Sequence, residues 1–408
     1  MKNAFDVLEE RGFLEQVTHE EEIRNLLAKE SVTFYIGFDP TADSLTIGHF
    51  LTLMAMSHMQ KAGHRPIALV GGGTGMVGDP TFKTDMRRVM PTDEIEKNVS
   101  KIKRQFSRFI DFSDGKALLI NNADWLLDLK YVPFIREYGA HFTISRMINA
   151  ECYKSRLDKG LTFFEFNYML MQSYDFLELF RRFGCKMQLG GSDQWANILG
   201  GAELIRRVEG ASAYGVTLKL LQTSSGEKMG KTAKGAVWLD AEKTSPYELF
   251  QYLRNVDDAD VGKCLSLLTF LPMDEINRLK ALKDEKINEA KEILAFETTK
   301  IIHDEAQALK ALDASRALFS DGADDGAAPT TEISRVEVSD GIDVITLLEK
   351  ARLIPTRSEG RRLVTQGGVK INGEKVSDVT AKIFTGDFKD GSLIIKKGKK
   401  GFHKIKLV

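Results

Sequence analysis

The fold of this chain is decided by the stretch Tyr35-Ile36-Gly37-Phe38-Asp39-Pro40-Thr41-Ala42-Asp43-Ser44-Leu45-Thr46-Ile47-Gly48-His49. Apolar side chains occupy every second position over residues 32–36, which predicts a strand. Asp39-Pro40 ends that strand because proline has no N–H to donate to a sheet. Apolar side chains then recur at helical spacing over residues 47–62. The chain therefore passes from a strand through a polar loop directly into a helix.

The start of this helix is a candidate phosphate site. Asp43 or Ser44 is expected to cap the helix. Free N–H groups and the positive end of the helix dipole together favour an anion at the first turn. Gly48 leaves room for a flat ring against the backbone, and Thr46 and His49 can both donate to phosphate oxygens. Taken alone, this pattern is also typical of an ordinary strand-to-helix turn.

A second stretch of the same kind lies at residues 186–195, where a strand leads into Gly190-Gly191-Ser192-Asp193-Gln194-Trp195. Ser192 or Asp193 is expected to cap the following helix. Residues 66–71 and 117–120 are typical of short buried strands in a parallel sheet. In an open α/β sheet, ligands bind at the carboxyl ends of the strands. The sequence therefore predicts an α/β domain with a ligand site at that edge.

A glycine-rich loop follows the second predicted strand. Gly73, Gly75 and Gly78 have the spacing of a dinucleotide-binding fingerprint. Asp79-Pro80 stops the helix that such a fingerprint needs, so we reject that interpretation. We expect the glycines to let the loop run close to a ligand, with Asp79 pointing into the pocket.

A second glycine loop, residues 223–232, ends like a phosphate-binding P-loop but has Ser225 where that motif needs glycine. What remains is a mobile loop in which Lys228 and Lys231 lie three residues apart. Two such lysines can clamp the leaving phosphates of a nucleotide.

Residues 163–176 predict a long apolar helix. Tyr168, Gln172 and Asp175 fall on one face of it. A polar stripe on an apolar helix is costly unless it meets partners. The stripe indicates either a hydrogen-bond network in the core or the wall of a pocket.

Length and composition limit the remaining possibilities. A chain of 408 residues is too long for one core, and 43% hydrophobic with 28% charged residues fits a globular protein. The net charge of −1 argues against binding polyanions over the whole surface. The three cysteines form no CxxC pair, no apolar run reaches about 18 residues, and no apolar leader is present. A cytoplasmic enzyme without a metal site or membrane partner is the expectation.

The residue pattern of the chain changes twice after the predicted α/β domain. Residues 1–30 have helical spacing, and residues 245–319 are helical in pattern throughout. After an acidic linker, residues 341–408 carry 15 Lys and Arg against 7 Asp and Glu, or +8. Residues 356–364 predict a basic helix and residues 367–376 a hairpin. This regular pattern favours a nucleic-acid-binding module over a solvated basic tail. Its candidate RNA-binding residues are Arg357, Arg361, Arg362 and Lys370.

Two motifs give the chain a family resemblance. Thr46-Ile47-Gly48-His49 resembles the HIGH motif of class I aminoacyl-tRNA synthetases, and Lys228-Met229-Gly230-Lys231-Thr232 resembles their KMSKS loop. Residues 37–42 and 190–195 narrow the resemblance to the bacterial-type tyrosyl-tRNA synthetases, over essentially the whole chain. The chain departs from the family pattern at Thr46, which stands for histidine, and at Thr232, which stands for serine.

The resemblance implies an α/β fold: a Rossmann-like parallel-sheet catalytic domain, an α-helical domain and a small α+β RNA-binding domain (S-four-like). It implies that L-tyrosine is activated with ATP and Mg²⁺ to tyrosyl-adenylate and then transferred to the 3′ end of tRNA(Tyr). It also implies a homodimer. The expected parts are the catalytic domain 1–222, the KMSKS-like loop and connection 223–244, the anticodon-binding domain 245–320, the linker 321–340 and the RNA-binding domain 341–408.

Carried over position by position, the resemblance assigns three groups of residues. Tyrosine would be bound by Tyr35, Asp79, Tyr168, Gln172, Asp175 and Gln194. ATP would be bound by Asp39, Gly48, Thr52, Gly191, Asp193 and Lys231. The reacting phosphates would be stabilised by Thr41, Thr46, His49, Lys83, Arg87, Lys228, Lys231 and Thr232.

Two other functions stay open at the level of sequence. A tryptophan-specific relative would share the fold, but Tyr35 and Asp175 suit a phenol better than an indole, whose one donor lies elsewhere. An RNA-binding protein that has lost catalysis is opposed by the intact groups of Asp79, His49 and Lys228.

Overall fold

The computed structural model describes residues 2–81, 90–232, 235–317, 330–389, 391–398 and 401–408. The chain divides into two compact units, Met1–Glu305 and Ala306–Val408. Each unit has a sheet of its own, mostly parallel in the first and mostly antiparallel in the second. Among the described residues we find no helix with the length and apolar character that crossing a bilayer requires.

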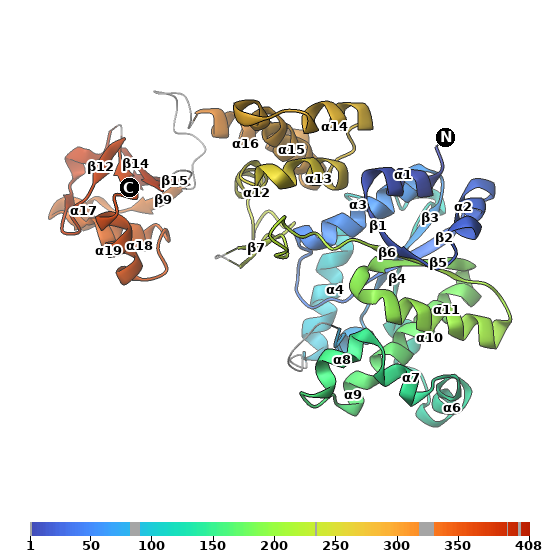
Figure 1. Cartoon of the computed structure of the whole chain (residues 1–408). Coiled ribbons are helices and arrows are strands. Elements are labelled where there is room, and N and C mark those ends of the chain that lie inside the picture. The colour runs from blue at the N-terminus through green and yellow to red at the C-terminus, as the bar shows by residue number, and fades with distance from the viewer. Residues whose placement is uncertain (1, 82–89, 233–234, 318–329, 390, 399–400) are drawn as a thin grey trace. The chain divides into compact units, whose positions relative to one another are not determined.

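The first unit is built on a six-stranded sheet in the order β1-β6-β5-β2-β3-β4 (Figure 1). The strands are β1 (Leu14–Val17), β2 (Thr33–Phe38), β3 (Arg65–Val70), β4 (Leu118–Asn121), β5 (Cys185–Gly191) and β6 (Tyr214–Leu218). Neighbours run parallel from β6 to β4, and β1 pairs antiparallel with β6. The predicted strands and their parallel arrangement are confirmed.

The strand β1 corrects one prediction. We expected residues 1–30 to be helical, and α1 (Ala4–Arg11) and α2 (Glu20–Lys29) are. Between them, Leu14–Val17 pairs with β6 at the edge of the sheet. A strand of 4 residues has too little pattern of its own to be predicted. It forms because the edge of β6 offers unpaired N–H and C=O groups.

Helices cover both faces of the sheet. α3 (Ile47–Lys61) and α4 (Thr92–Phe106) contact β3, whereas α10 (Tyr168–Phe183) and α11 (Trp195–Glu209) contact β5 and lie below the strands in Figure 1. α10 and α11 can pack closely because Gly201 has no side chain. A Cβ at that position would come within 2.8 Å of the Phe176 ring. Five short helices precede α10: α5 (Ala123–Leu126), α6 (Tyr131–Glu137), α7 (Ile144–Ile148), α8 (Glu151–Leu157) and α9 (Phe163–Phe166).

The cap of α3 is Thr46, in place of the expected Asp43 or Ser44. The Asp43 carboxylate instead forms ion pairs with Lys101 and Lys243. These two cations lie far away in sequence and hold the pKa of Asp43 at about 2. The local pattern at Asp43 was that of a cap, but partners from elsewhere in the fold engage its side chain.

Four further helices of the first unit follow a short hairpin of β7 (Lys231–Thr232) and β8 (Gly235–Ala236). They are α12 (Pro246–Arg254), α13 (Asp258–Leu268), α14 (Met273–Lys280) and α15 (Ile287–Ile302), and α16 (Glu305–Ala317) comes next. α12 packs on α15, and α13 packs on α3 as well as on its neighbours. The all-helical pattern predicted for this segment is confirmed up to Ala317.

The second unit has a five-stranded sheet in the order β12-β11-β14-β15-β9. Its strands are β9 (Thr330–Ile333), β11 (Val369–Ile371), β12 (Glu374–Val376), β14 (Ser392–Lys397) and β15 (Gly401–Leu407), with β10 (Ile342–Asp343) and β13 (Lys382–Ile383) as a separate pair. Its helices are α16, which begins at the boundary between the units, α17 (Arg335–Ser339), α18 (Val344–Lys350) and α19 (Arg357–Thr365).

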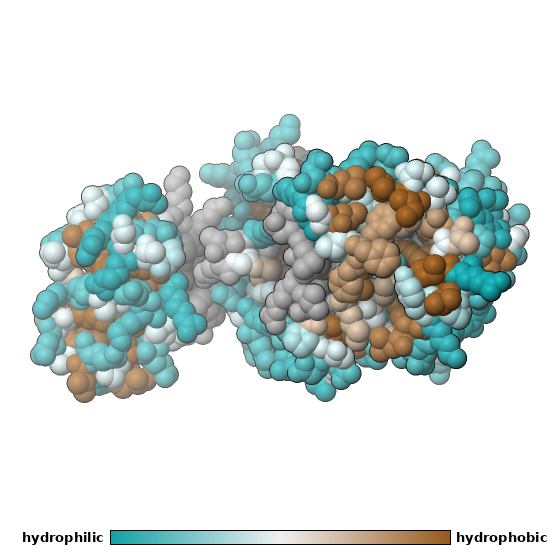
Figure 2. Space-filling model, turned by 90° about the horizontal axis from the view of Figure 1, so that it is seen from below, coloured by the Kyte–Doolittle hydropathy of each residue, from teal (hydrophilic) through white to brown (hydrophobic). Residues whose placement is uncertain are grey.

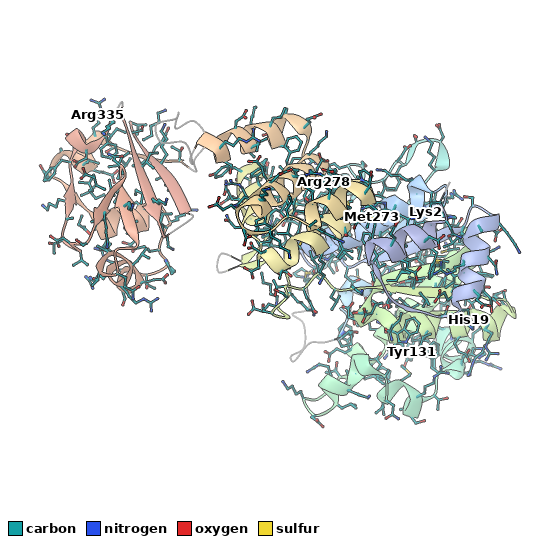
Figure 3. All side chains as sticks on the ribbon, turned by 45° about the horizontal axis from the view of Figure 1, so that its top comes forward. Lys2, His19, Tyr131, Met273, Arg278 and Arg335 are labelled. Carbon is teal, nitrogen blue, oxygen red and sulfur yellow. The ribbon has the colours of Figure 1, made fainter. Side chains whose placement is uncertain are left out.

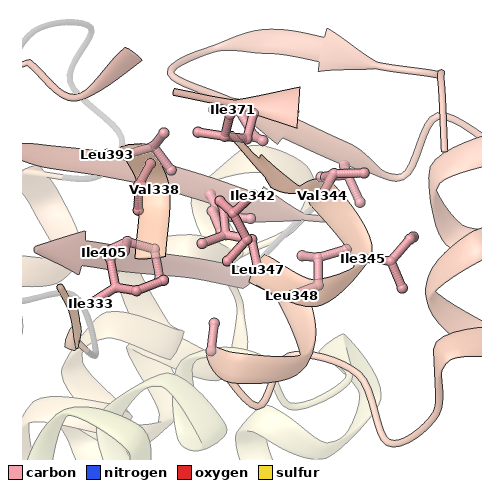
Figure 4. Close-up of a cluster of buried hydrophobic side chains, with 14 of the residues drawn as sticks. Ile333, Val338, Ile342, Val344, Ile345, Leu347, Leu348, Ile371, Leu393 and Ile405 are labelled. Carbon is pink, nitrogen blue, oxygen red and sulfur yellow. The ribbon is translucent and has the colours of Figure 1, made fainter. Parts of the chain in front are cut away.

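Fully buried aliphatic side chains such as Leu347, Leu393 and Ile405 form the core of the second unit (Figure 4). The predicted basic helix and the hairpin with its Asn372-Gly373 turn are both present. β9 pairs with β15, so residues 330–340, which we assigned to a linker, belong to this unit instead. The position of β9 depends on its pairing with β15, which is remote in the sequence, and no local pattern reveals such a partner.

The Arg11 side chain links the end of α1 to the end of α13 by hydrogen bonds. Its guanidinium is buried and donates to the backbone carbonyls of Ser266, Thr269 and Leu271. Carbonyls at a helix end have no partner within the helix, and a cation there also complements the helix dipole. Arg11 therefore joins the sheet part of the first unit to its helical part.

Replacing Arg11 with alanine should destabilise the chain by about 2–4 kcal/mol, since several buried carbonyls lose a charged donor. Urea unfolding of the first unit measures this loss. Arg278, labelled in Figure 3, is the control, because its ion pairs with Glu275 and Glu289 are half exposed. Arg278→Ala should cost less than about 1 kcal/mol. Equal losses in the two variants would contradict the assigned role of Arg11.

Candidate active site

A cavity of about 270 Å³ opens at the carboxyl ends of β2 and β5. This is the edge at which the sequence predicted a ligand site. The predicted residues that line it are Tyr35, Asp39, Thr41, Gly48, His49, Thr52, Asp79, Tyr168, Gln172, Asp175, Gly191, Asp193 and Gln194. The polar stripe of α10 is therefore the wall of a pocket.

Asp175, on α10, is the most deeply buried carboxylate that lines the cavity. Its carboxylate accepts hydrogen bonds from Asn122 Nδ2 at 2.9 Å and from Trp125 Nε1 at 2.8 Å. Burial raises the pKa of Asp175 to about 8, although both donors act in the opposite direction. The Tyr35 hydroxyl and the Gln188 amide oxygen are buried without a protein partner. Buried polar atoms of this kind require a partner, which a ligand can supply.

In the middle of the cavity, Asp39 follows β2. Its carboxylate accepts hydrogen bonds from the Tyr168 hydroxyl and from Thr74 Oγ1, both at 2.9 Å. Thr74 itself accepts a hydrogen bond from Asn122, which also binds Asp175. A continuous chain of hydrogen bonds thus joins the two carboxylates.

The third carboxylate, Asp79, lies on the glycine loop and is 7% exposed. Its Oδ1 accepts from Thr81, and its Oδ2 accepts from Gln194 Nε2 at 2.6 Å. Gln194 in turn accepts from Gln172, whose own amide oxygen has no protein partner. Carboxylate and amide oxygens facing a cavity suit a ligand with several N–H donors, such as an ammonium group.

The glycine loop packs closely against protein groups, and Gly71 at its start also lines the cavity. A Cβ on Gly71 would lie 2.2 Å from Asp39 Oδ1, and one on Gly72 would lie 2.3 Å from Asn121 Oδ1. We expected the glycines to allow close approach to a ligand. The structure shows close approach to the side chains that shape the cavity, and close approach to a ligand stays a prediction.

His49 lies in the first turn of α3, and its contacts with Thr46 leave the ring Nε2 as a hydrogen-bond donor. Its Nδ1 accepts the Thr46 backbone N–H at 3.1 Å, and the Thr46 hydroxyl lies 3.0 Å from the same atom. Burial lowers the pKa of His49 to about 4, so the ring is neutral at pH 7. Because Nδ1 accepts, the proton is on Nε2. Thr46 does not line the cavity, since its hydroxyl engages His49 instead.

After the carboxyl end of β5, residues 192–194 form a 3-10 turn. Gln194 is the cap of α11, in place of the expected Ser192 or Asp193. This turn brings Asp193 and Gln194 to the cavity wall. Burial and the nearby Asp79 raise the pKa of Asp193, whereas the charge of Lys228 lowers it. Lys228 therefore lies close enough to act electrostatically on the cavity.

The remaining predicted residues either do not line the cavity or lie outside the described residues. Lys228 and Lys231 do not line it, and Lys231 and Thr232 form the short strand β7. Lys83 and Arg87 lie outside the described residues.

Sequence reasoning missed Thr74, Asn122, Trp125 and Gln188. A signal existed for Asn122, since a polar residue directly after a buried strand lies at the ligand edge of a sheet. Gln188 is a polar residue within an apolar strand, and register pairs it with Tyr35 on the neighbouring strand. The importance of Thr74 and Trp125 depends on contacts that only the fold creates.

A larger cavity of about 670 Å³ lies between residues 141–150 and α11, and Asp193 borders both cavities. We assign the chemistry to the smaller cavity because Asp39, Asp79 and Asp175 converge there.

Residues 27–320 match the family of tRNA synthetases class I (W and Y). Residues 325–405 match the tyrosine–tRNA ligase SYY-like C-terminal domain.

Individual proteins that are similar to this chain are tyrosyl-tRNA synthetases as well. The tyrosine–tRNA ligases of Acetivibrio thermocellus and Lachnoclostridium phytofermentans are each 60% identical to this chain, covering 100% and 98% of both partners. A solved C-terminally truncated mitochondrial tyrosyl-tRNA synthetase of Aspergillus nidulans has a TM-score of 0.71 at 29% identity, covering 78% of this chain and 95% of its own. The Archaeoglobus fulgidus enzyme, solved with L-tyrosine, shares the fold with a TM-score of 0.58 at 17% identity, covering 76% of this chain and 99% of its own. With 60% identity over its full length, the chain belongs to the tyrosyl-tRNA synthetases and is a tyrosine–tRNA ligase that depends on ATP.

Proposed function

We propose that the smaller cavity binds tyrosine with its phenol at Asp175, and that ATP binds beside it with its phosphates at His49. The observation that carries this proposal is the set of buried polar atoms without a protein partner: Tyr35 Oη, Gln172 Oε1 and Gln188 Oε1. All three residues line the cavity.

For tyrosine, Tyr35 and Asp175 bind the phenol hydroxyl, and Asp79, Tyr168 and Gln172 bind the ammonium group. Phenylalanine has no hydroxyl, so it would leave the buried Tyr35 hydroxyl without a partner and would offer no polar group to Asp175. Such a loss gives strong discrimination, for which tyrosyl-tRNA synthetase is itself a standard example.

For ATP, Gly191 and Asp193 bind the ribose, Gly48 lies under the adenine with Thr52 nearby, and Asp39 and Gln194 lie near the reacting groups. Thr41, His49, Lys228 and Lys231 stabilise the phosphates, with Lys83, Arg87, Thr46 and Thr232 in supporting roles. We propose that Mg²⁺ enters with ATP, because transfer at phosphorus requires charge neutralisation.

The tyrosine carboxylate attacks the α-phosphorus of ATP in line, and pyrophosphate leaves. The 3′-terminal ribose hydroxyl of tRNA(Tyr) then attacks the acyl carbon, and AMP leaves. Neither step needs a side-chain nucleophile, so catalysis consists of positioning and stabilising charge. The neutral His49, with its proton on Nε2, suits this role because it donates without titrating near pH 7.

Replacing both Lys228 and Lys231 with alanine should slow tyrosine-dependent ATP–pyrophosphate exchange by roughly 10²–10³-fold or more, since charge stabilisation on the leaving phosphates is lost. Tyrosine affinity, measured by equilibrium dialysis, should stay unchanged. Exchange with tryptophan and phenylalanine, run alongside, should be undetectable. Normal exchange in the double variant would remove the two lysines from the mechanism.

We further propose a function for each part of the chain. The parallel-sheet domain, residues 1–222, is Rossmann-like and catalytic, and residues 223–244 form the connecting loop. The helices of residues 245–320 bind the anticodon arm, and the S-four-like end of the chain binds tRNA. With these substrates, the protein acts in the cytoplasm.

The basic helix α19 supports the tRNA assignment. Arg361 and Arg362 are exposed, whereas Arg357 is within 2.8 Å of Glu349 and also close to Asp343. Lys370 on β11 is exposed as well. Arg361 and Arg362 are therefore the better placed to meet phosphates.

Arg361→Ala/Arg362→Ala should weaken tRNA binding and reduce its salt dependence by a slope of roughly 1 for each phosphate that is no longer neutralised. Filter binding over a range of salt concentrations measures both quantities. ATP–pyrophosphate exchange should be unaffected, and Arg335→Ala, on α17, serves as the control. An unchanged salt slope would count against this face as the RNA site.

The protein is proposed to be a homodimer. Of the 12 exposed large hydrophobic side chains in the described chain, 8 fall between Leu127 and Phe164, including Tyr131, Val132 and Phe163. Figure 2 shows hydrophobic side chains gathered on the underside of the molecule. Exposed apolar side chains concentrated in one part of the chain favour an interface there, and a second copy is the occupant that the family resemblance suggests.

Phe163→Asp should convert the dimer into a monomer in analytical ultracentrifugation, because a buried, unpaired charge at the interface is costly. Val336→Asp is the matched control, since Val336 is 82% exposed in the second unit. A wild-type protein that sediments as a monomer would refute the dimer.

A further inference from the structure

The loop that resembles KMSKS is attached to two separate parts of the first unit. On one side it contacts the start of α3, because Gly230 O accepts from Val237 N and Val237 O accepts from Ile47 N. Gly230 also packs directly on Ile47, where a Cβ would come within 2.3 Å. The loop is thereby tied to the helix turn that carries His49.

On the other side, the same loop contacts helices α12 and α13. The backbone N–H of Gly230 donates to the Tyr252 hydroxyl on α12 at 2.7 Å. Met229 is 7% exposed, and its sulfur lies 3.8 Å from the Cys264 sulfur on α13. Lys263 Nζ donates to the backbone carbonyl of Gln222, at the entrance to the loop, at 2.9 Å.

Apart from the contact at Gln222, these contacts with α12 and α13 fall on Met229 and Gly230, the two residues between the loop lysines. Lys228 precedes Met229, and Lys231 follows Gly230 directly. A backbone anchored at Met229 and Gly230 limits where both ammonium groups can go. Of these anchors, the Tyr252 hydroxyl is the one that a single-atom substitution removes cleanly.

We propose that Tyr252 is a positioning residue for tyrosine activation: its hydroxyl holds Gly230 and thereby sets the place of the Lys228 and Lys231 ammonium groups. The inference rests on the proposed role of those lysines. Tyr252 itself does not line the cavity, so it acts through the loop. Its loss affects the transition state, in which charge develops on the phosphates, more than it affects tyrosine binding.

The test is the rate of tyrosyl-adenylate formation in Tyr252→Phe, measured in a single turnover. The rate should fall about 3- to 10-fold, the worth of one hydrogen bond, with the Kd for tyrosine unchanged. Tyr247→Phe is the matched control on the same helix, and its rate should be that of the wild type. Melting temperatures of both variants verify that they are folded.

A second comparison separates positioning from a general structural effect. In the Lys228→Ala/Lys231→Ala background, Tyr252→Phe should slow the residual rate by less than about 2-fold, because the groups it positions are gone. An equal slowing in both backgrounds overturns the inference, as does a wild-type rate in Tyr252→Phe. A wild-type rate in the lysine variant overturns the role of the lysines first, and this inference with it.

Discussion

The side chain of Asn122 is the group on which the active site most depends. Its amide nitrogen donates to Thr74 and to Asp175, and its amide oxygen accepts the Gly73 N–H. One buried residue at the end of β4 thus holds the glycine loop, α10 and, through Thr74, Asp39. A buried network of this kind specifies one geometry only when all of its members are satisfied. The carboxylates of Asp39 and Asp175 both take their orientation from this amide.

The opposite end of the cavity is organised by backbone groups around α3. Thr46 fixes the tautomer of His49 through its N–H, and the residue after it, Ile47, contacts the lysine loop. Donors at both ends of the cavity are therefore oriented before substrates arrive. Preorganised donors of this kind suit a reaction that proceeds by positioning and charge stabilisation.

Local sequence patterns predicted the strands, the long helices, the C-terminal hairpin and the edge of the sheet at which the cavity lies. They failed where a distant partner decides the outcome. Asp43 is held by Lys101 and Lys243 and does not cap α3. Leu14–Val17 and Thr330–Ile333 are strands because β6 and β15 offer them an edge. In each case the decisive contact is remote in the chain.

The sequence by itself determined many of the chemical groups that line the cavity, because residues after a parallel strand lie at its carboxyl end. That rule brings Asp39, Asp79 and Asp193 together without any knowledge of packing. Only the tertiary structure decided how those groups are used. The proton on His49 Nε2, the raised pKa of Asp175 and the anchoring of Gly230 by Tyr252 all arise from burial and hydrogen bonds. Burial and hydrogen bonds between distant residues exist only once the chain has folded.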